Sequence, residues 1–104
     1  MSWMKLESEY DDLDKYKSNI GNIYYCKKDT NIHHNPYGPA VYKKYGSEIY
    51  YIENKLHRLA GPAIIWYDGY EEYYINDKRL DKEEFEKHPD RLKFLGKEYL
   101  ICLG

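Results

Sequence analysis

Four histidines and several pairs of acidic residues are the side chains of this 104-residue chain that could do chemistry. Imidazole nitrogens bind metal ions, and two carboxyl groups that flank one reacting bond can act as general acid and base. His33 and His34 are adjacent, and His57 follows His34 by 23 positions. No Cys or acidic residue stands at a spacing that would complete a metal site with them, so we expect no metal and no cofactor.

The acidic pairs do not form a catalytic arrangement either. Glu71-Glu72 lies in a strand-like segment, where neighbouring side chains point to opposite faces. Asp11-Asp12 and Glu83-Glu84 lie in segments that we interpret as helices with solvated faces. The sequence also has no nucleophile motif, phosphate-binding loop or dinucleotide fingerprint. We therefore expect a protein that is not an enzyme.

Composition favours a protein partner over nucleic acid. The 16 basic and 18 acidic residues leave a net charge of −2, whereas dedicated nucleic-acid binders are distinctly basic. The chain has 14 Tyr but only 2 Phe and 2 Trp, and Tyr suits half-buried strands and interfaces. Cys26 and Cys102 are far apart, which favours free thiols over a disulfide. With no signal peptide and no apolar run that could insert into a membrane, the sequence predicts a cytoplasmic protein.

An internal repeat of 23 residues organises the middle of the chain, because residues 54–80 echo residues 31–56. The features that recur at this offset are His34 and His57, Gly38-Pro39-Ala40 and Gly61-Pro62-Ala63, Gly46 and Gly69, Tyr50-Tyr51 and Tyr73-Tyr74, Ile52 and Ile75, and Lys55 and Lys78. A degraded earlier copy covers residues 20–34. A period of this length indicates stacked supersecondary units. A residue that every unit carries serves the fold, so we interpret both histidines as structural partners of the turn before Gly-Pro-Ala.

Each unit is predicted to be a β-hairpin. A short β-branched and aromatic run, 41–42 or 64–67, precedes a turn at Gly46 or Asp68-Gly69, and a return strand follows at 48–52 or 71–75. A second turn is expected at Glu53-Asn54 and at Asn76-Asp77. Pro39 and Pro62 should stand where a strand begins. The fold class is therefore mainly β (α+β), an antiparallel meander of about two and a half units over residues 20–80.

The two ends of the single domain, residues 1–104, are predicted to cap this meander. Apolar residues spaced by three or four predict a helix over 5–17 within an N-terminal cap, 1–19: Trp3, Leu6, Tyr10, Leu13 and Tyr16. In the C-terminal cap, 81–104, Asp81 and Glu84 predict a capped helix that ends near His88, with Phe85 facing the sheet. A turn at Gly96 and a final strand over 99–103 are expected after it.

The repeat resembles the MORN-repeat pattern. The stretches "HRLAGPA" and "DGYEEYYIN" are similar to divergent MORN-like repeats of large-phage and giant-virus proteins, over roughly residues 20–81. Two features differ: Asn54 and Asp77 replace the Gly usual in the second turn, and Gly-Pro-Ala stands where the family commonly has Gly-x-Gly. The resemblance implies non-catalytic binding by a viral accessory protein. Such a protein would bind and inhibit a host protein in the host cytoplasm, for instance a defence nuclease.

Strand alternation predicts which side chains would meet such a partner. We expect Tyr50, Ile52, Tyr73 and Ile75 on the core face, with Ala40, Tyr42, Ala63 and Ile65. The opposite face would then carry the candidate partner-binding residues Tyr51, Trp66, Tyr74, Lys43 and Glu72. The terminal helices could instead cover this face, and the sequence leaves both alternatives open.

Two further functions stay open at this point. An aromatic sheet face could stack a nucleotide or a single-stranded nucleic acid. Unpaired sheet edges could pair between copies of the chain and form a structural homo-oligomer, such as a homodimer.

Overall fold

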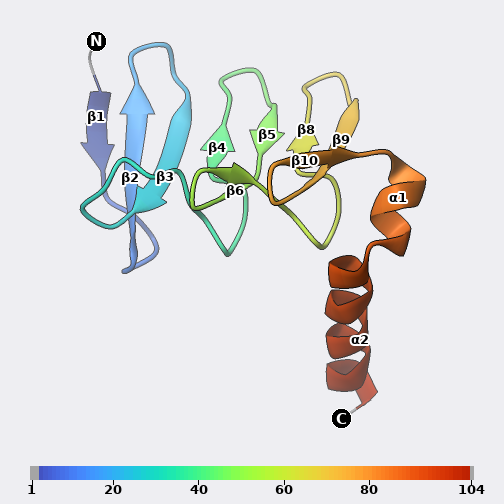
Figure 1. Ribbon diagram of the computed structural model, residues 1–104. Coiled ribbons are helices and arrows are strands. Elements are labelled where there is room, and N and C mark those ends of the chain that lie inside the picture. The colour runs from blue at the N-terminus through green and yellow to red at the C-terminus, as the bar shows by residue number, and fades with distance from the viewer. Residues whose placement is uncertain (1–2, 104) are drawn as a thin grey trace.

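The computed structural model describes residues 3–103, and side chains for residues 3–96 (Figure 1). Its elements are β1 (Trp3–Leu6), β2 (Leu13–Ser18), β3 (Ile23–Lys27), β4 (Val41–Tyr42), β5 (Glu48–Ile49), β6 (Tyr51–Ile52), β7 (Lys55–Leu56), β8 (Ile64–Ile65), β9 (Glu71–Ile75), β10 (Lys78–Leu80), α1 (Lys82–Lys87) and α2 (Pro89–Leu103). Eight strands form one sheet in the order β1-β2-β3-β4-β5-β8-β9-β10, and β6 pairs with β7. All these pairs are antiparallel, which confirms the predicted mainly β meander.

The hairpin tips repeat one turn three times, at the upper rim of the sheet in Figure 1. Gly21, Gly46 and Gly69 have φ of 95°, 107° and 90°, a region that residues with a Cβ rarely adopt. Around them the same main-chain bond recurs, from Ser18 N–H to Asn22 O, from Lys43 N–H to Ser47 O, and from Trp66 N–H to Tyr70 O. The degraded first copy therefore has the same tip turn as the two clear repeats.

The second turn of each unit has two consecutive residues with positive φ. Glu53 and Asn54 have φ of 48° and 66°, and Asn76 and Asp77 have φ of 50° and 69°. This is the type I′ geometry, whose twist matches that of the flanking strands. Asn and Asp tolerate this region, which is why the predicted turns form without glycine.

His34 and His57 have a structural role, but they hold these second turns and not the turn into Gly-Pro-Ala that was expected. The Glu53 N–H donates to His34 Nδ1 at 3.0 Å, and the Asn76 N–H donates to His57 Nδ1 at 3.1 Å. Burial lowers the pKa of both imidazoles below the ordinary value for histidine. Both rings therefore stay neutral and keep Nδ1 as an acceptor.

The Gly-Pro-Ala turns connect one unit to the next. Ala40 and Ala63 are completely buried, and their carbonyls accept from Tyr25 N–H and Tyr50 N–H, both at 2.7 Å. Side chains from equivalent positions close the turns: Asn35 donates to the carbonyl of Pro39, and Arg58 donates to that of Pro62. The segments around Gly38 and Gly61 are therefore main-chain junctions, and both prolines precede their strands as expected.

The core lies on a different face from the one predicted for the first repeat. Val41, Ile49 and Ile64 are buried together, and Tyr24, Tyr51, Leu56 and Tyr74 pack against them, whereas Tyr42 is 38% exposed. Ile49 and Tyr51 are two residues apart and share a face, and their packing against Val41 and Ile64 makes this face the core in place of that of Tyr50 and Ile52. Tyr51 begins β6, which forms a hairpin with β7. This hairpin, and not a terminal helix, contributes Tyr51 and Leu56 to the cluster. In the second repeat, Tyr73 and Ile75 do belong to a core, as predicted.

The N-terminal helix predicted over residues 5–17 is wrong, because this segment forms β1 and β2. A main-chain bond from Leu13 N–H to Tyr10 O turns the chain between them. β2 pairs with β3 over five residue pairs, from Leu13↔Lys27 to Lys17↔Ile23. An isolated helix of this length is marginal in water, whereas the exposed edge of β3 offers a full ladder of bonds.

The first C-terminal helix is confirmed. Glu84 N–H donates to Asp81 Oδ1 at 2.8 Å and Asp81 N–H donates to Glu84 Oε1 at 3.0 Å, so the capping box is complete. Phe85, which is 1% exposed, packs with Ile75 and Leu80 and lies 4.8 Å from the ring of Tyr73. Phe85 stands 23 positions after Pro62, so α1 replaces the Gly-Pro-Ala junction at this end.

The predicted turn at Gly96 and strand over 99–103 are wrong, because Pro89–Leu103 forms α2, which projects away from the sheet in Figure 1. Pro89 is favourable in the first turn of a helix, and the Leu, Lys and Glu residues that follow are strong helix formers. A single Gly inside a helix costs only about 1 kcal/mol, too little to end it. Within residues 3–103, no helix is both long and apolar enough to cross a membrane.

Phe85→Ala should lower the free energy of unfolding by about 3–5 kcal/mol, because it leaves a cavity between α1 and the last hairpin. Urea unfolding followed by circular dichroism measures the change. Glu86→Ala, on the exposed side of the same helix, is the control and should stay within about 0.5 kcal/mol of the parent. A loss of less than about 1 kcal/mol for Phe85→Ala would contradict the packing described here.

Acid should weaken the fold through His34 and His57. Their pKa values are lower in the folded chain than the ordinary value of about 6.5, so the unfolded chain binds protons first as the pH falls. Stability is therefore complete above about pH 6.5 and declines as the pH drops below it toward the folded pKa values. Thermal unfolding between pH 7.5 and 5.5 measures this slope. The double variant His34→Asn, His57→Asn keeps an acceptor that does not titrate, and it should flatten the slope; an unchanged slope would contradict this role.

Candidate functional site

Three of the five candidate partner-binding residues meet around one carboxylate. Glu72 accepts from Trp66 Nε1 at 2.5 Å and from the Tyr74 hydroxyl at 3.4 Å. Arg79 Nε lies 3.5 Å from Glu72 Oε1, and Arg79 also donates to the Tyr70 hydroxyl at 3.3 Å. The Glu72 side chain is only 12% exposed, so these partners replace most of its water. Burial and the adjacent Glu72 carboxylate both raise the pKa of Tyr74.

The other two candidates lie elsewhere. Tyr51 packs against the buried cluster of Val41, Ile49 and Ile64, where burial raises the pKa of its hydroxyl. Lys43 is exposed at a hairpin tip. Sequence reasoning missed Arg79 and Tyr70. Arg79 could have been found, because a two-residue turn after Ile75 fixes the pairing of Arg79 with Tyr74 across the strands.

The outer edge of β9 around Glu71 lacks the strand that an interior unit has there. Glu48, the equivalent of Glu71 in the preceding unit, pairs with Ile65 of the next unit. Glu71 pairs with Ile65 on its inner side, and among the described strands β9 has only one other neighbour, β10, along Tyr73–Ile75. Because Tyr70 O accepts from Trp66 N–H across the hairpin, the main-chain groups of Glu71 face outward. We call residues 70–72 the β9 edge.

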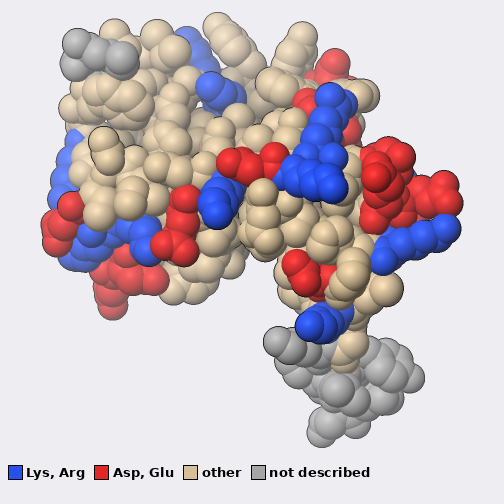
Figure 2. All heavy atoms as spheres, viewed as in Figure 1, with Lys and Arg blue, Asp and Glu red and all other residues tan. Residues whose placement is uncertain are grey.

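A groove of about 530 Å³ runs along the β9 edge. Residues 70–73 form one wall, and residues 79–82, which lead into α1, form the other. Both main-chain groups and exposed side chains are therefore available at this place: Tyr70 is 57% exposed and Trp66 36% exposed. On the face that Figure 2 shows, basic and acidic side chains are interspersed.

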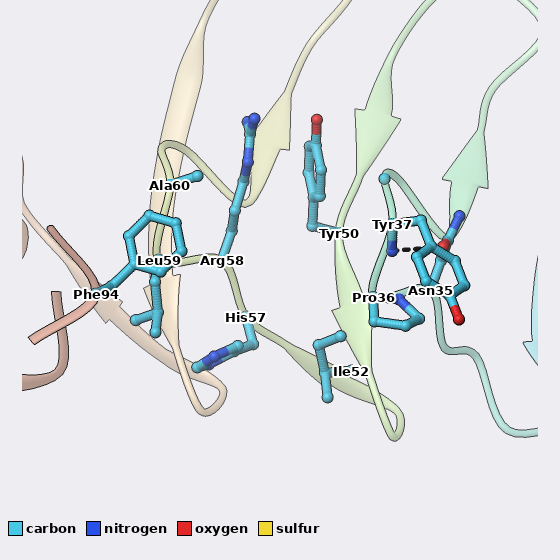
Figure 3. Close-up of a pocket in the computed structure, with 11 residues that line it drawn as sticks. Asn35, Pro36, Tyr37, Tyr50, Ile52, His57, Arg58, Leu59, Ala60 and Phe94 are labelled. Atoms are coloured by element: carbon cyan, nitrogen blue, oxygen red, sulfur yellow. Dashed lines mark hydrogen bonds between the residues drawn. The ribbon is translucent and has the colours of Figure 1, made fainter. Parts of the chain in front are cut away.

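A second pocket, of about 340 Å³, lies between two units and is shown in Figure 3. Arg58, which lines this pocket, is engaged within the protein, because its guanidinium stacks on the Tyr50 ring at 3.9 Å and donates to the Pro62 carbonyl. Figure 3 shows these two side chains lying side by side. Asn35 on the opposite wall is likewise bonded within its own turn. This pocket is therefore a junction between repeats.

The described residues offer no metal centre, since no three His, Cys, Asp or Glu side chains among them could hold one ion. Cys26 is a buried thiol whose Sγ lies 3.7 Å from His33 Nδ1. The side chain of Cys102 lies outside the described part of the chain, so the predicted absence of a disulfide stays a prediction.

Comparison with known proteins found no matching family model, no matching curated protein and no matching solved structure. The resemblance to MORN-like repeats therefore stays a prediction.

Glu72→Ala should lower the free energy of unfolding by about 1–3 kcal/mol, because it leaves Trp66, Tyr74 and Arg79 without their shared acceptor. Chemical unfolding monitored by tryptophan fluorescence measures the loss. Glu71→Ala removes an exposed carboxylate from the same strand and should change stability by no more than about 0.5 kcal/mol. Equal losses of stability in the two variants would show that the contacts of the Glu72 carboxylate with Trp66, Tyr74 and Arg79 do not stabilise the fold.

Proposed function

We propose that this protein is a non-enzymatic protein-binding module whose partner adds an extended strand to the β9 edge. The observation that supports this is the missing neighbour of Glu71, at the position where an interior unit pairs with the next one. Strand addition of this kind obtains affinity from main-chain hydrogen bonds and specificity from side-chain pockets.

The interior junctions indicate which strand would fit. Each incoming strand there begins with a completely buried Ala, Ala40 or Ala63, followed by a buried β-branched residue, Val41 or Ile64. A small residue allows the close main-chain approach, and the β-branched side chain packs on the core face. The partner strand should therefore carry a small residue followed by Val or Ile.

The side chains beside the β9 edge are of the types that dominate binding energy in protein interfaces. Tyr70 and Arg79 line the groove and Trp66 donates to Glu72 on its wall, and Trp, Tyr and Arg are enriched among such residues. Glu72 and Arg79 fix one another, so the rings are held in place before a partner arrives. The identity of the partner as a host protein, and its inhibition, rest on the viral resemblance and stay predictions.

A peptide copied from an interior junction tests the proposal. A fluorescent peptide of residues 38–46 (GPAVYKKYG) should bind the intact protein saturably, because it contains β4, the strand that pairs with the edge of β3 in the preceding unit. Methylating the amide nitrogen at the Tyr42 position should weaken binding about fivefold by removing one hydrogen bond. Methylation at the neighbouring Val41 position should leave affinity unchanged, because amides alternate between the two edges of a strand. Fluorescence anisotropy measures both.

Variants at Glu71 provide the matched control in the protein. Glu71→Pro removes the outward N–H and should abolish peptide binding, while Glu71→Thr keeps the N–H and should retain it. Thermal unfolding shows whether the Pro variant is folded. Binding that survives Glu71→Pro in a folded protein, or that is equally sensitive to methylation at both peptide positions, would overturn the proposed edge.

A further inference from the structure

A third pocket, of about 450 Å³, lies at the opposite end of the sheet from the β9 edge, and aromatic side chains dominate it. Strands β1, β2 and β3 and the loop after β3 supply its lining: Trp3, Tyr16, Tyr24, Cys26, Thr30 and His33, together with Asn31. The strand register brings the three largest rings to one face. Tyr16 pairs with Tyr24, and Trp3 pairs with Ser18, two residues from Tyr16 on the same face.

The rings form a corner in which Trp3 keeps an accessible face. The Trp3 and Tyr24 rings lie 4.7 Å apart and are inclined by 57°, and the His33 ring lies 5.5 Å from Tyr24, inclined by 24°. Trp3 is 44% exposed although it is large and apolar, so this corner does not bury its widest ring within the described chain. A planar ligand that entered here would stack on indole or phenol and remove that surface from water.

Hydrogen-bonding groups stand beside these rings. Cys26 Sγ lies 3.7 Å from His33 Nδ1. Burial raises the pKa of the thiol and lowers that of the imidazole, so both groups favour their neutral forms. The second ring nitrogen of the neutral His33 ring donates or accepts according to the tautomer. Asn31 adds an amide, which can both donate and accept, as the edges of nucleobases do.

We propose that this pocket binds the nucleobase of an uncharged nucleoside by stacking on Trp3 and Tyr24. The charge of the lining residues decides the ligand class. The lining has no Lys or Arg to pair with a phosphate and no Asp or Glu to pair with an ammonium group. Aromatic faces beside an amide and a neutral imidazole match a flat, neutral heterocycle with a polar edge. The site is separate from the β9 edge, so neither proposal depends on the other.

Fluorescence quenching tests the pocket directly, because the chain has 2 Trp and one of them lines it. In a Trp66→Phe background Trp3 is the only tryptophan, and adenosine, guanosine, cytidine and uridine are titrated separately. At least one nucleoside should quench Trp3 saturably. Binding should be the same in 50 and 500 mM salt, and the monophosphate should bind no more tightly, since no cation contacts the phosphate.

Isothermal titration calorimetry measures the nucleoside affinity of further variants, which are made in the parent protein without the Trp66→Phe change. Trp3→Ala should weaken nucleoside binding about tenfold, in line with the loss of one stacking partner, and Tyr16→Ala, which removes another ring of the lining, should also weaken it. Tyr45→Ala, which removes a 79% exposed ring from a hairpin tip, should bind like the parent. Thermal unfolding shows that each variant is folded.

Several results would overturn this proposal. One is no saturable quenching by any nucleoside up to 10 mM, and another is unchanged affinity in Trp3→Ala. Choline or maltose binding in place of nucleosides would show that the rings serve a cation or a sugar. Tighter, salt-sensitive binding of a single-stranded oligonucleotide would show that the ligand is a nucleic-acid strand.

Discussion

Main-chain hydrogen bonds that start in one unit and end in the next are the interaction on which this structure depends. Tyr25 N–H reaches the carbonyl of Ala40, and Tyr50 N–H reaches that of Ala63, at the same distance of 2.7 Å. Side chains repeat the connection at the tips, where Asn22 accepts from Lys44 N–H and Ser47 accepts from Tyr67 N–H. Because each unit is completed by its neighbour, no hairpin is expected to be stable alone.

The first and last units of such a structure each lack one neighbouring unit, so other elements take that place. At the C-terminal end, the residue 23 positions after the Gly-Pro-Ala proline is Phe85, and α1 occupies the place of the next junction. The helix covers Tyr73 and Ile75 but leaves the β9 edge unpaired. At the N-terminal end, β1 and β2 extend the sheet and bring Trp3 beside Tyr24. The proposed protein-binding edge and the proposed nucleoside pocket are thus both consequences of ending a repeat.

The parts of the fold that could be predicted are those in which a few neighbouring residues favour a single local conformation. Gly46 and Gly69 adopt a φ that favours glycine, Asn76-Asp77 form a turn that these residues tolerate, and Asp81 with Glu84 forms a capping box. The predictions of an N-terminal helix and of a C-terminal strand were wrong because the apolar spacing in these segments fits more than one structure. For the candidate site, the strand pattern identified Trp66, Glu72 and Tyr74, but it also grouped them with Tyr51 and Lys43, which lie elsewhere.

The sequence by itself determined the repeat and its turns, since these depend on residues close together in the chain or on a fixed offset of 23. The turn that each recurring histidine holds lies 19 residues further along the chain and was decided by the tertiary structure. Only the tertiary structure decided which face is the core. Alternation grouped Tyr51 and Tyr74 on one face, but only their packing against Val41, Ile49 and Ile64 shows that this face is buried. The tertiary structure also decided that β2 is a strand, because the partner that stabilises it, β3, becomes available only after folding.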